Sequence, residues 1–133
     1  MWEKAITESA VKKSSPVIGL SHLRITLSES FYVGPGRADL MELIAETGSI
    51  SSAAKRMGMS YKRAWELVQA LNEGFGAPLV ETARGGREQG ASLTEAGREV
   101  LERYRGMQDA TRRAIARDVD ALAALHSDIS KRK

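Results

Sequence analysis

The densest potential for molecular recognition lies in the run Ser60-Tyr61-Lys62-Arg63, which combines hydroxyl, ammonium and guanidinium groups. Such groups donate hydrogen bonds to phosphate and base oxygens, and the two cations neutralise phosphate charge. At the start of a helix they are the kind of side chain that the major groove of DNA accepts. We expect Ser60 and Lys62 to contact phosphates and Tyr61 and Arg63 to lie nearer the bases. The alternative is a solvated helix face.

Further candidates for DNA contact stand on both sides of this run. Glu66 shares the outer face of the same helix. Trp65 either stacks on a sugar-phosphate edge or closes the core beside a hairpin, and neither reading is favoured. Arg84 and Arg87 lie in the turn of that hairpin, where they reach phosphates or a minor groove unless the hairpin is simply exposed. Lys55, in the preceding helix, lies near the DNA backbone or in solvent.

Two short helices joined by a tight turn are expected to position these groups. Ser49 is a good N-cap for a helix over 50–57, and Gly58 stands where a left-handed residue would end that helix. The small pair Ala53-Ala54 lets a second helix, capped by Ser60, approach closely. The apolar residues of this second helix recur at steps of three and four: Ala64, Leu67, Val68 and Leu71. The pattern is typical of a helix-turn-helix.

The residues before the helix-turn-helix predict a tail, a strand and a helix. Residues 1–17 mix Lys, Glu and Ser with little apolar periodicity, and we expect a flexible tail. Polar and apolar residues alternate over 17–33, which predicts one half-buried strand. The next helix, starting near residue 37, is expected to turn three acids outward, away from the phosphates of any DNA: Asp39, Glu42 and Glu46.

A wing is expected after the helix-turn-helix. Residues 72–78 read as a Gly-rich loop, and 78–82 and 91–93 read as short strands. The turn between the two strands carries two arginines and three glycines. Strand, basic glycine turn and strand together form the outline of a wing.

A long helix is the last element that the sequence predicts. Thr94 caps it and Glu95 suits the positive end of its dipole. Apolar residues then recur at steps of three or four for about 35 residues, more than a small domain needs for its own core. We expect this helix, residues 94–130, to dimerise, with Gly106 marking the junction between its packed and projecting parts. The expected dimerisation residues are Met107, Ile115, Val119, Leu122 and Leu125.

The composition limits the classes of function that the chain can have. The chain has 133 residues, 42% hydrophobic but only 5% aromatic, and 20 basic against 17 acidic residues give a net charge of +3. A slightly basic balance is compatible with nucleic acid without proving it. No cysteine is present, and His22 and His126 are far apart in sequence, so neither a metal site nor a cofactor is expected. No apolar run reaches the length of a membrane span, and a cytoplasmic location without membrane contact is expected.

Catalysis is not expected either. Ser52-Ala53-Ala54-Lys55 spells the Ser-x-x-Lys of some acyl-transfer enzymes but lacks their other motifs. The glycine-rich stretch over 85–90 is not followed by Lys-Ser or Lys-Thr, so it is not a phosphate-binding P-loop. We therefore predict that the protein is not an enzyme.

Several short sequence motifs resemble those of ModE-type winged helices of the LysR and ModE class, over about residues 20–104. They are Gly48-Ser49-Ile50-Ser51 with Ala53-Ala54, Met59-Ser60-Tyr61-Lys62 with Ala64-Trp65, Leu79-Val80-Glu81, Gly85-Gly86, and Leu93-Thr94 with Gly97. The resemblance implies a mainly α fold with a small β wing, organised as a winged helix-turn-helix over 18–93 plus the long dimerisation helix. ModE proteins add C-terminal domains that sense molybdate. The chain ends soon after the long helix, so no molybdate sensing in cis is expected.

Two classes of function fit these features. The first is a sequence-specific transcriptional regulator that binds double-stranded DNA as a homodimer at a pseudo-palindromic site. The alternative is a nonspecific nucleoid-type DNA binder or a winged helix used as a protein-interaction module. A specific regulator discriminates against competitor DNA, whereas an interaction module gives no DNA shift.

Overall fold

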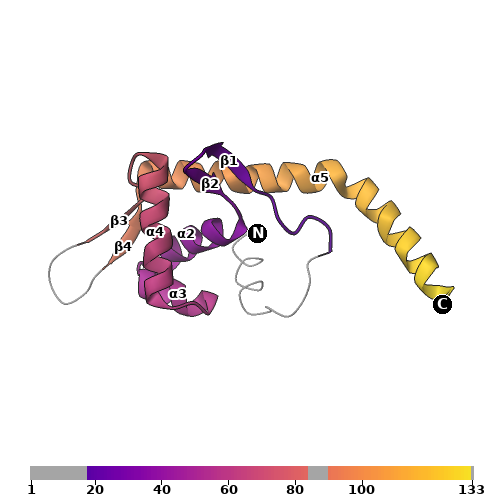
Figure 1. Ribbon diagram of the computed structural model, residues 1–133, viewed down its shortest axis with the longest axis horizontal. Helices are drawn as coiled ribbons and strands as arrows, with labels where there is room; N and C mark the ends of the chain where they lie inside the picture. The colour runs from indigo at the N-terminus through magenta and orange to yellow at the C-terminus, as the bar shows by residue number, and fades with distance from the viewer. Residues whose placement is uncertain (1–17, 84–89, 133) are drawn as a thin grey trace.

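A computed structural model describes residues 18–83 and 90–132. Its elements follow in the order β1 (Ile25–Ser28), β2 (Phe31–Val33), α2 (Pro35–Thr47), α3 (Ile50–Met57), α4 (Tyr61–Phe75), β3 (Val80–Thr82), β4 (Ala91–Leu93) and α5 (Glu95–Lys131). Helices α2, α3 and α4 form a compact body, α5 crosses its top and projects far beyond it, and the β3–β4 hairpin extends from one side (Figure 1). The predicted fold class, mainly α with a small β wing and a long C-terminal helix, is confirmed.

The core of the body is mainly aliphatic, with Phe31 and Tyr104 as buried aromatic residues. Ala53 of α3 and Ala64 of α4 are completely buried, so these two helices pack with little side-chain volume between them. Larger buried side chains from α2, α4 and the wing fill the rest: Leu40, Met41, Leu43, Ile44, Val68, Leu71 and Leu79. Within the described part of the chain, no helix is long and apolar enough to cross a membrane.

The helix-turn-helix has the boundaries that its capping residues predict. The side chain of Ser49 accepts a hydrogen bond from the Ser52 N–H at 3.1 Å, and that of Ser60 accepts one from the Arg63 N–H at 3.1 Å. Gly58 ends α3 with φ of 71°, a left-handed conformation that glycine adopts without strain. Local sequence signals therefore fix the turn between α3 and α4.

Helix α4 continues beyond its expected end, and the loop predicted over 72–78 is wrong in its first half. The Asn72 side chain is satisfied without breaking the helix, because its Oδ1 accepts from the Leu79 and Val80 N–H groups and its Nδ2 donates to the Val80 carbonyl. Gly74 leaves room for the backbone of Ser30 beside it. The helix ends only at Gly76, where φ is 87°.

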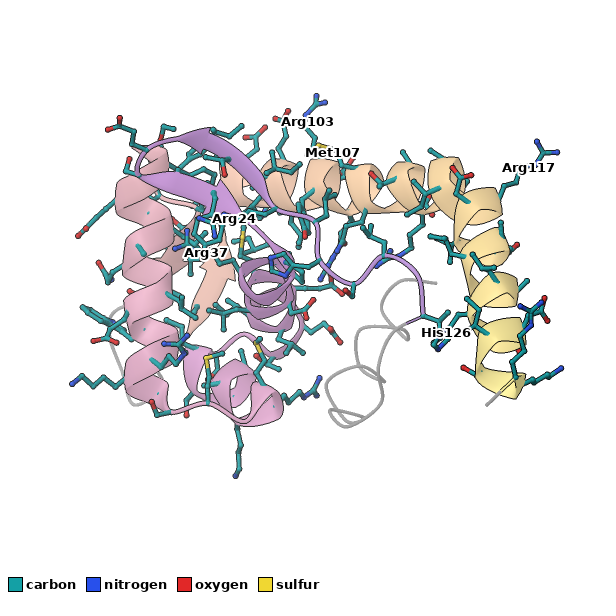
Figure 2. All side chains as sticks on the ribbon, turned by 45° about the vertical axis from the view of Figure 1, so that its right-hand side comes forward. Arg24, Arg37, Arg103, Met107, Arg117 and His126 are labelled. Carbon is teal, nitrogen blue, oxygen red and sulfur yellow. The ribbon has the colours of Figure 1, made fainter. Side chains whose placement is uncertain are left out.

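The single strand predicted over 17–33 is instead the β1–β2 hairpin. The two strands pair antiparallel with a register shift between Thr26 and Ser28, so the alternation of the first strand does not continue into the second. Leu27, expected to face inward, is 63% exposed. The hairpin is held on α2 by stacking, since the Arg24 and Arg37 guanidinium carbons lie 3.7 and 3.9 Å from the centre of the Tyr32 ring (Figure 2).

Glu42 does not point outward, and this prediction is wrong. Its side chain is 1% exposed and accepts a hydrogen bond at 2.8 Å from Nε of Arg105, which α5 brings over α2. The same guanidinium donates to Asp39 at 2.7 Å and to Gln108 at 2.9 Å. Glu46 is exposed as expected. The packing of α5 on α2, which the local pattern does not encode, determines which acids are covered.

Burial raises the pKa of the Glu42 carboxyl to about 7, since desolvation outweighs the nearby Arg105 guanidinium. Its second oxygen, Oε2, is buried without a hydrogen-bond partner among the described residues. Between the usual pKa of 4.5 and about 7, the folded protein therefore holds a proton that the unfolded chain releases. Ionisation of Glu42 thus lowers the stability of the fold as the pH rises through this window.

We expect the free energy of unfolding of the wild-type protein to fall between about pH 5 and about pH 8 by more than that of a Glu42→Gln variant, which has no proton to lose at this position. Asp39, whose pKa burial also raises, is present in both proteins but interacts with Glu42, so the difference between the two profiles reports the coupled pair. Urea titrations of the two proteins at several pH values measure the difference. Parallel pH profiles would show that Glu42 does not titrate in this range.

Helix α5 begins as predicted, with the Thr94 hydroxyl accepting from the Gly97 N–H at 3.0 Å, and it is continuous through Gly106. Gly106 does not break the helix, because one glycine costs a helix only about 1 kcal/mol. The last buried residue of α5 is Gln108, so the packed part ends close to Gly106 even though the helix does not. Beyond it α5 projects outward and changes direction near Arg117 (Figures 1 and 2).

Candidate nucleic-acid interface

The start of α4 lies at the end of the body furthest from α5, next to α3 (Figure 1). Residues 60–63 are all exposed there, and their side chains surround the first turn of the helix. Because Ser60 uses its hydroxyl oxygen as the N-cap, its position at this end is fixed by the fold. The structure thus brings the hydroxyl and basic groups of this run to one accessible tip.

Trp65 and Glu66 follow on the next turn of α4. Trp65 is 44% exposed, so it is not enclosed in the core beside the wing, and part of its side chain is accessible to a ligand. Glu66 is exposed and ion-pairs with no described residue within 4 Å. A carboxylate in this position accepts hydrogen bonds, for example from the amino group of cytosine. Glu66 lies on the outer face as expected, Trp65 is exposed rather than enclosed in the core, and the contacts of both with DNA stay predictions.

Gln69 is a residue of this face that the sequence analysis did not single out. It is half-buried and lies one turn after Trp65 on α4. Lys62, Glu66 and Gln69 are spaced by four and three residues, so they share one side of the helix. The same spacing rule, applied to polar residues, would have found it. A glutamine amide can pair with adenine through two hydrogen bonds.

The wing is held to the turn between α2 and α3 by a backbone hydrogen bond. Strands β3 and β4 pair antiparallel, with Val80 opposite Leu93 and Thr82 opposite Ala91. The Ala91 N–H donates to the Gly48 carbonyl at 2.8 Å, which ties β4 to the turn between α2 and α3. Arg84 and Arg87 lie outside the described residues, and the part they play stays a prediction.

Lys55 is exposed near the end of α3 and lines an open hollow with Thr47, Ser52 and Arg56. Arg56 lies 3.9 Å from Glu46, so its charge is partly paired. Lys55 has no acidic partner within 4 Å among the described residues, which leaves its charge available to a phosphate. In the described ranges, no group of three acids, histidines or cysteines is placed to hold a metal ion.

The expected dimerisation residues extend along α5 beyond the body. Leu122 and Leu125 are largely exposed, whereas Ile115 and Val119 are half-buried. Val119 lies beside Gly19, in the segment that runs along α5 before β1. Met107 lies on the upper edge of α5 next to Arg103 (Figure 2). The residues therefore form a stripe with one covered edge, and its role in dimerisation stays a prediction.

Three features define a winged helix-turn-helix DNA-binding domain. They are the helix-turn-helix with the exposed basic start of α4, the β3–β4 hairpin bonded to the turn before α3, and the helix α2 that packs against α3. Residues 38–98 match the family model of the bacterial regulatory helix-turn-helix protein, lysR family. The chain belongs to this LysR and ModE class of DNA-binding domains, which confirms the resemblance read from the sequence.

Two curated relatives illustrate the similarity. The chain is 44% identical over 84 residues to the molybdenum-pterin-binding protein MopA of Rhodobacter capsulatus, covering 62% of this chain and 32% of that protein. It is 36% identical over 103 residues to the DNA-binding transcriptional dual regulator ModE of Escherichia coli K12, covering 75% of this chain and 39% of that protein. The chain thus spans about a third of the length of these relatives.

Two solved structures are similar as well, and both contain DNA. The CbnR_DBD–DNA complex is 31% identical with a TM-score of 0.53, and the match covers 65% of this chain and 95% of that chain. Full-length CbnR complexed with its target DNA is 31% identical with a TM-score of 0.50, covering 62% and 27%. Together with the family match, these structures identify a DNA-binding domain of transcriptional regulators.

Proposed function

We propose that this protein is a sequence-specific transcriptional regulator that binds double-stranded DNA as a homodimer at a pseudo-palindromic site. The observation that carries the proposal is the exposed, capped start of α4, which presents Tyr61, Lys62 and Arg63 away from the body. A protruding helix of this width fits the major groove, and the arginine and lysine match acceptors on guanine and on phosphate.

The wing and α3 support the same reading. The backbone bond between Ala91 and Gly48 holds the hairpin at a fixed position relative to the turn that precedes α3. Lys55, exposed near the end of α3, adds a cation to the same helix-turn-helix. Phosphate contacts on both sides of a recognition helix fix its register in the groove, so that base contacts can be selective.

The dimer is proposed from α5. This helix has 37 residues, but no residue beyond Gln108 is buried within 109–132, although apolar side chains continue to Ile129. A second copy of the same stripe is an occupant of matching chemistry and length. A two-fold axis through α5 would present two copies of α4 to two half-sites related by the same symmetry.

The names of the relatives state what the whole proteins bind. ModE is a DNA-binding transcriptional regulator, and this supports the proposal for the matched domain. MopA binds a molybdenum-pterin, but this chain spans 32% of that protein. The expectation that the present chain does not itself sense molybdate therefore stays a prediction.

Selection of bound sequences from a random DNA pool tests the proposal directly. A specific dimeric regulator should enrich a motif with two inverted halves and should keep a discrete shifted band in excess competitor DNA. Enrichment of no motif, with a ladder of bands that disappears as salt rises, would identify a nonspecific binder instead. If the protein shifts no DNA at all, the alternative of a winged helix used as a protein-interaction module remains.

Arg63→Ala is expected to relax the preference at one base pair by about 1 to 3 kcal/mol, because an arginine that contacts a base edge distinguishes that base from the others. Lys62→Ala, at a proposed phosphate contact, should instead weaken binding to all sequences and reduce the salt slope by about one. Shift titrations on the selected site and on single-base variants measure both effects.

A matched control is Arg103→Ala. Arg103 carries the same charge but is exposed on the upper side of α5, where it pairs with Glu99 (Figure 2). We expect it to leave both affinity and sequence preference unchanged. An equal loss of preference in the Arg63 and Lys62 variants would contradict the division between base and phosphate contacts.

A further inference from the structure

Helix α5 is fixed to the body at two separate places. At its start, the Thr94 hydroxyl donates to the Pro78 carbonyl at 2.7 Å, and Gly97 packs against the backbone of Leu79. Eight residues later, roughly 12 Å along the helix, Arg105 reaches α2. Two points define a line, so these contacts fix the direction of α5 relative to the helices below it.

The second contact is chemically demanding. Arg105 is 13% exposed and donates from Nε to Glu42, from Nη2 to Asp39 and from Nη1 to Gln108, at 2.8, 2.7 and 2.9 Å. The planar guanidinium fork requires all three acceptors to lie in set directions, whereas an apolar contact tolerates sliding. This cluster therefore constrains the rotation and tilt of α5 more tightly than packing alone.

The cluster continues to the β1 side of the body. Gln108 donates from Nε2 to the Tyr104 hydroxyl at 3.3 Å, and that hydroxyl donates to the Leu23 carbonyl at 2.6 Å. The segment before β1 is thus bonded to the same network as α2. Tilting α5 would break hydrogen bonds on both sides of the helix.

A buried ion cluster of this kind is a poor source of stability. Replacing such a cluster by apolar residues of similar volume is often neutral or stabilising, because taking the charges out of water is costly. Its directional geometry, which apolar side chains cannot reproduce, is the property that distinguishes it. The most direct consequence of that property is a fixed angle between α5 and α2.

Small changes in this angle are magnified along the helix. From Arg105 to Leu122 is about 25 Å, so a tilt of about 10° displaces the distal stripe by about 4 Å relative to the body. One base pair of DNA rises about 3.4 Å and turns about 35°. In a dimer joined through the distal stripe, a tilt of this size shifts each recognition helix by more than one base pair.

We propose that Arg105, held by Asp39 and Glu42, is the positioning residue that sets the distance between the two DNA half-sites that the dimer accepts. The inference rests on the proposed function, since it requires a dimer that binds two half-sites. Arg105 belongs to α5, which crosses the end of the body opposite to the start of α4 (Figure 1), and its hydrogen-bond partners Asp39, Glu42 and Gln108 include no proposed DNA contact. It acts on specificity only through the direction of α5.

The test uses the full chain and a set of DNA duplexes in which the selected half-sites are separated by the original spacer or by one or two base pairs more or fewer. The central variant is the pair Arg105→Met with Glu42→Leu, which removes the fork together with its fully buried partner and leaves only Asp39, whose side chain is 30% exposed and reaches water. Arg105→Lys is the second variant, since it keeps the charge and loses the fork. Arg103→Met, two residues away and exposed, is the control.

For the wild type and the control, we expect about a tenfold loss of affinity for each base pair of change in the spacer. Both Arg105 variants should sediment as dimers and bind a single half-site as the wild type does, but their preference among spacers should fall to about threefold or less. A merely structural role would weaken all duplexes equally and leave the order of preference unchanged.

Folded, dimeric variants with the wild-type spacer preference would overturn the inference and leave the proposed function intact. If the apolar pair fails to fold, the Arg105→Lys variant decides the matter by the same criterion. A wild-type chain that stays monomeric, or that binds one half-site as tightly as two, would remove the proposed function and the inference with it. The two failures are therefore distinguished by the behaviour of the wild type alone.

Discussion

Replacing Leu122 and Leu125 together by aspartate is expected to convert the protein into a monomer and to reduce its affinity for a complete two-half site by about 100-fold or more. The two leucines are 65% and 55% exposed and stand on the projecting part of α5. Affinity for an isolated half-site should stay at the wild-type value, because neither residue lies near the start of α4. The change therefore separates dimerisation from DNA contact.

The physical reason is the burial of apolar surface. Covering one large aliphatic side chain contributes roughly 1.5 to 3 kcal/mol. In the proposed two-fold contact, each leucine would be covered in both copies of the chain. Aspartate at the same positions would place charges in an apolar contact opposite their own copies, which costs several kcal/mol. A dimer then loses its principal stabilisation, and the two half-sites are bound independently.

Sedimentation velocity and shift titrations on full and half sites measure the two effects. Ala124→Asp is the matched control, since it adds one charge to the same turn at an exposed position about 200° around the helix from Leu122. The control should remain dimeric. A double variant that still sediments as a dimer would show that α5 does not join the two copies.

Gly97→Ala is expected to destabilise the fold by roughly 2 to 4 kcal/mol. A Cβ at Gly97 would collide with the backbone carbonyl of Leu79, and neither the helix start nor β3 can yield easily, because Thr94 is bonded to both Pro78 and Leu79. Relief of the collision requires α5 to lift from the wing. The loss should appear as a lower urea midpoint for the full chain.

The control for this prediction lies in the same helix. A Cβ at Gly106 would meet nothing within 4 Å, so Gly106→Ala should stabilise the protein by roughly 0.5 to 1 kcal/mol through helix propensity alone. Opposite signs for the two substitutions are the expected result. Stabilisation by both would mean that α5 does not approach Leu79 as closely as described.

Local sequence determined the helix-turn-helix. Ser49, Gly58 and Ser60 act through hydrogen bonds and backbone conformations that span at most a few residues, so their effect is readable without knowledge of the rest of the fold. The start of α5 at Thr94 was readable for the same reason. The candidate contacts at the start of α4 followed directly, because their exposure depends on the cap and on the helical period.

The β1–β2 hairpin and the length of α4 were decided by hydrogen bonds between neighbouring elements, which the pattern within one element does not show. Asn72 looks like a loop residue by its own preference, but its side chain is satisfied by β3 and the helix continues. The alternation over 17–33 is interrupted by a register shift that single-strand periodicity does not reveal. In both places, these hydrogen bonds override the local preference of the residues.

The burial of Glu42 shows most clearly what only the tertiary structure decided. Its partner Arg105 is 63 positions away, and the pairing exists because α5 crosses α2 at this point. Sequence periodicity assigns an acid to the outer face of a helix by default, since ionised groups are costly to bury unless they are paired. The sequence by itself determined the helix-turn-helix, the start of α5 and the exposed start of α4. The direction of α5 was set by the packing of the whole chain, through the hydrogen bonds of Arg105 that no local pattern encodes.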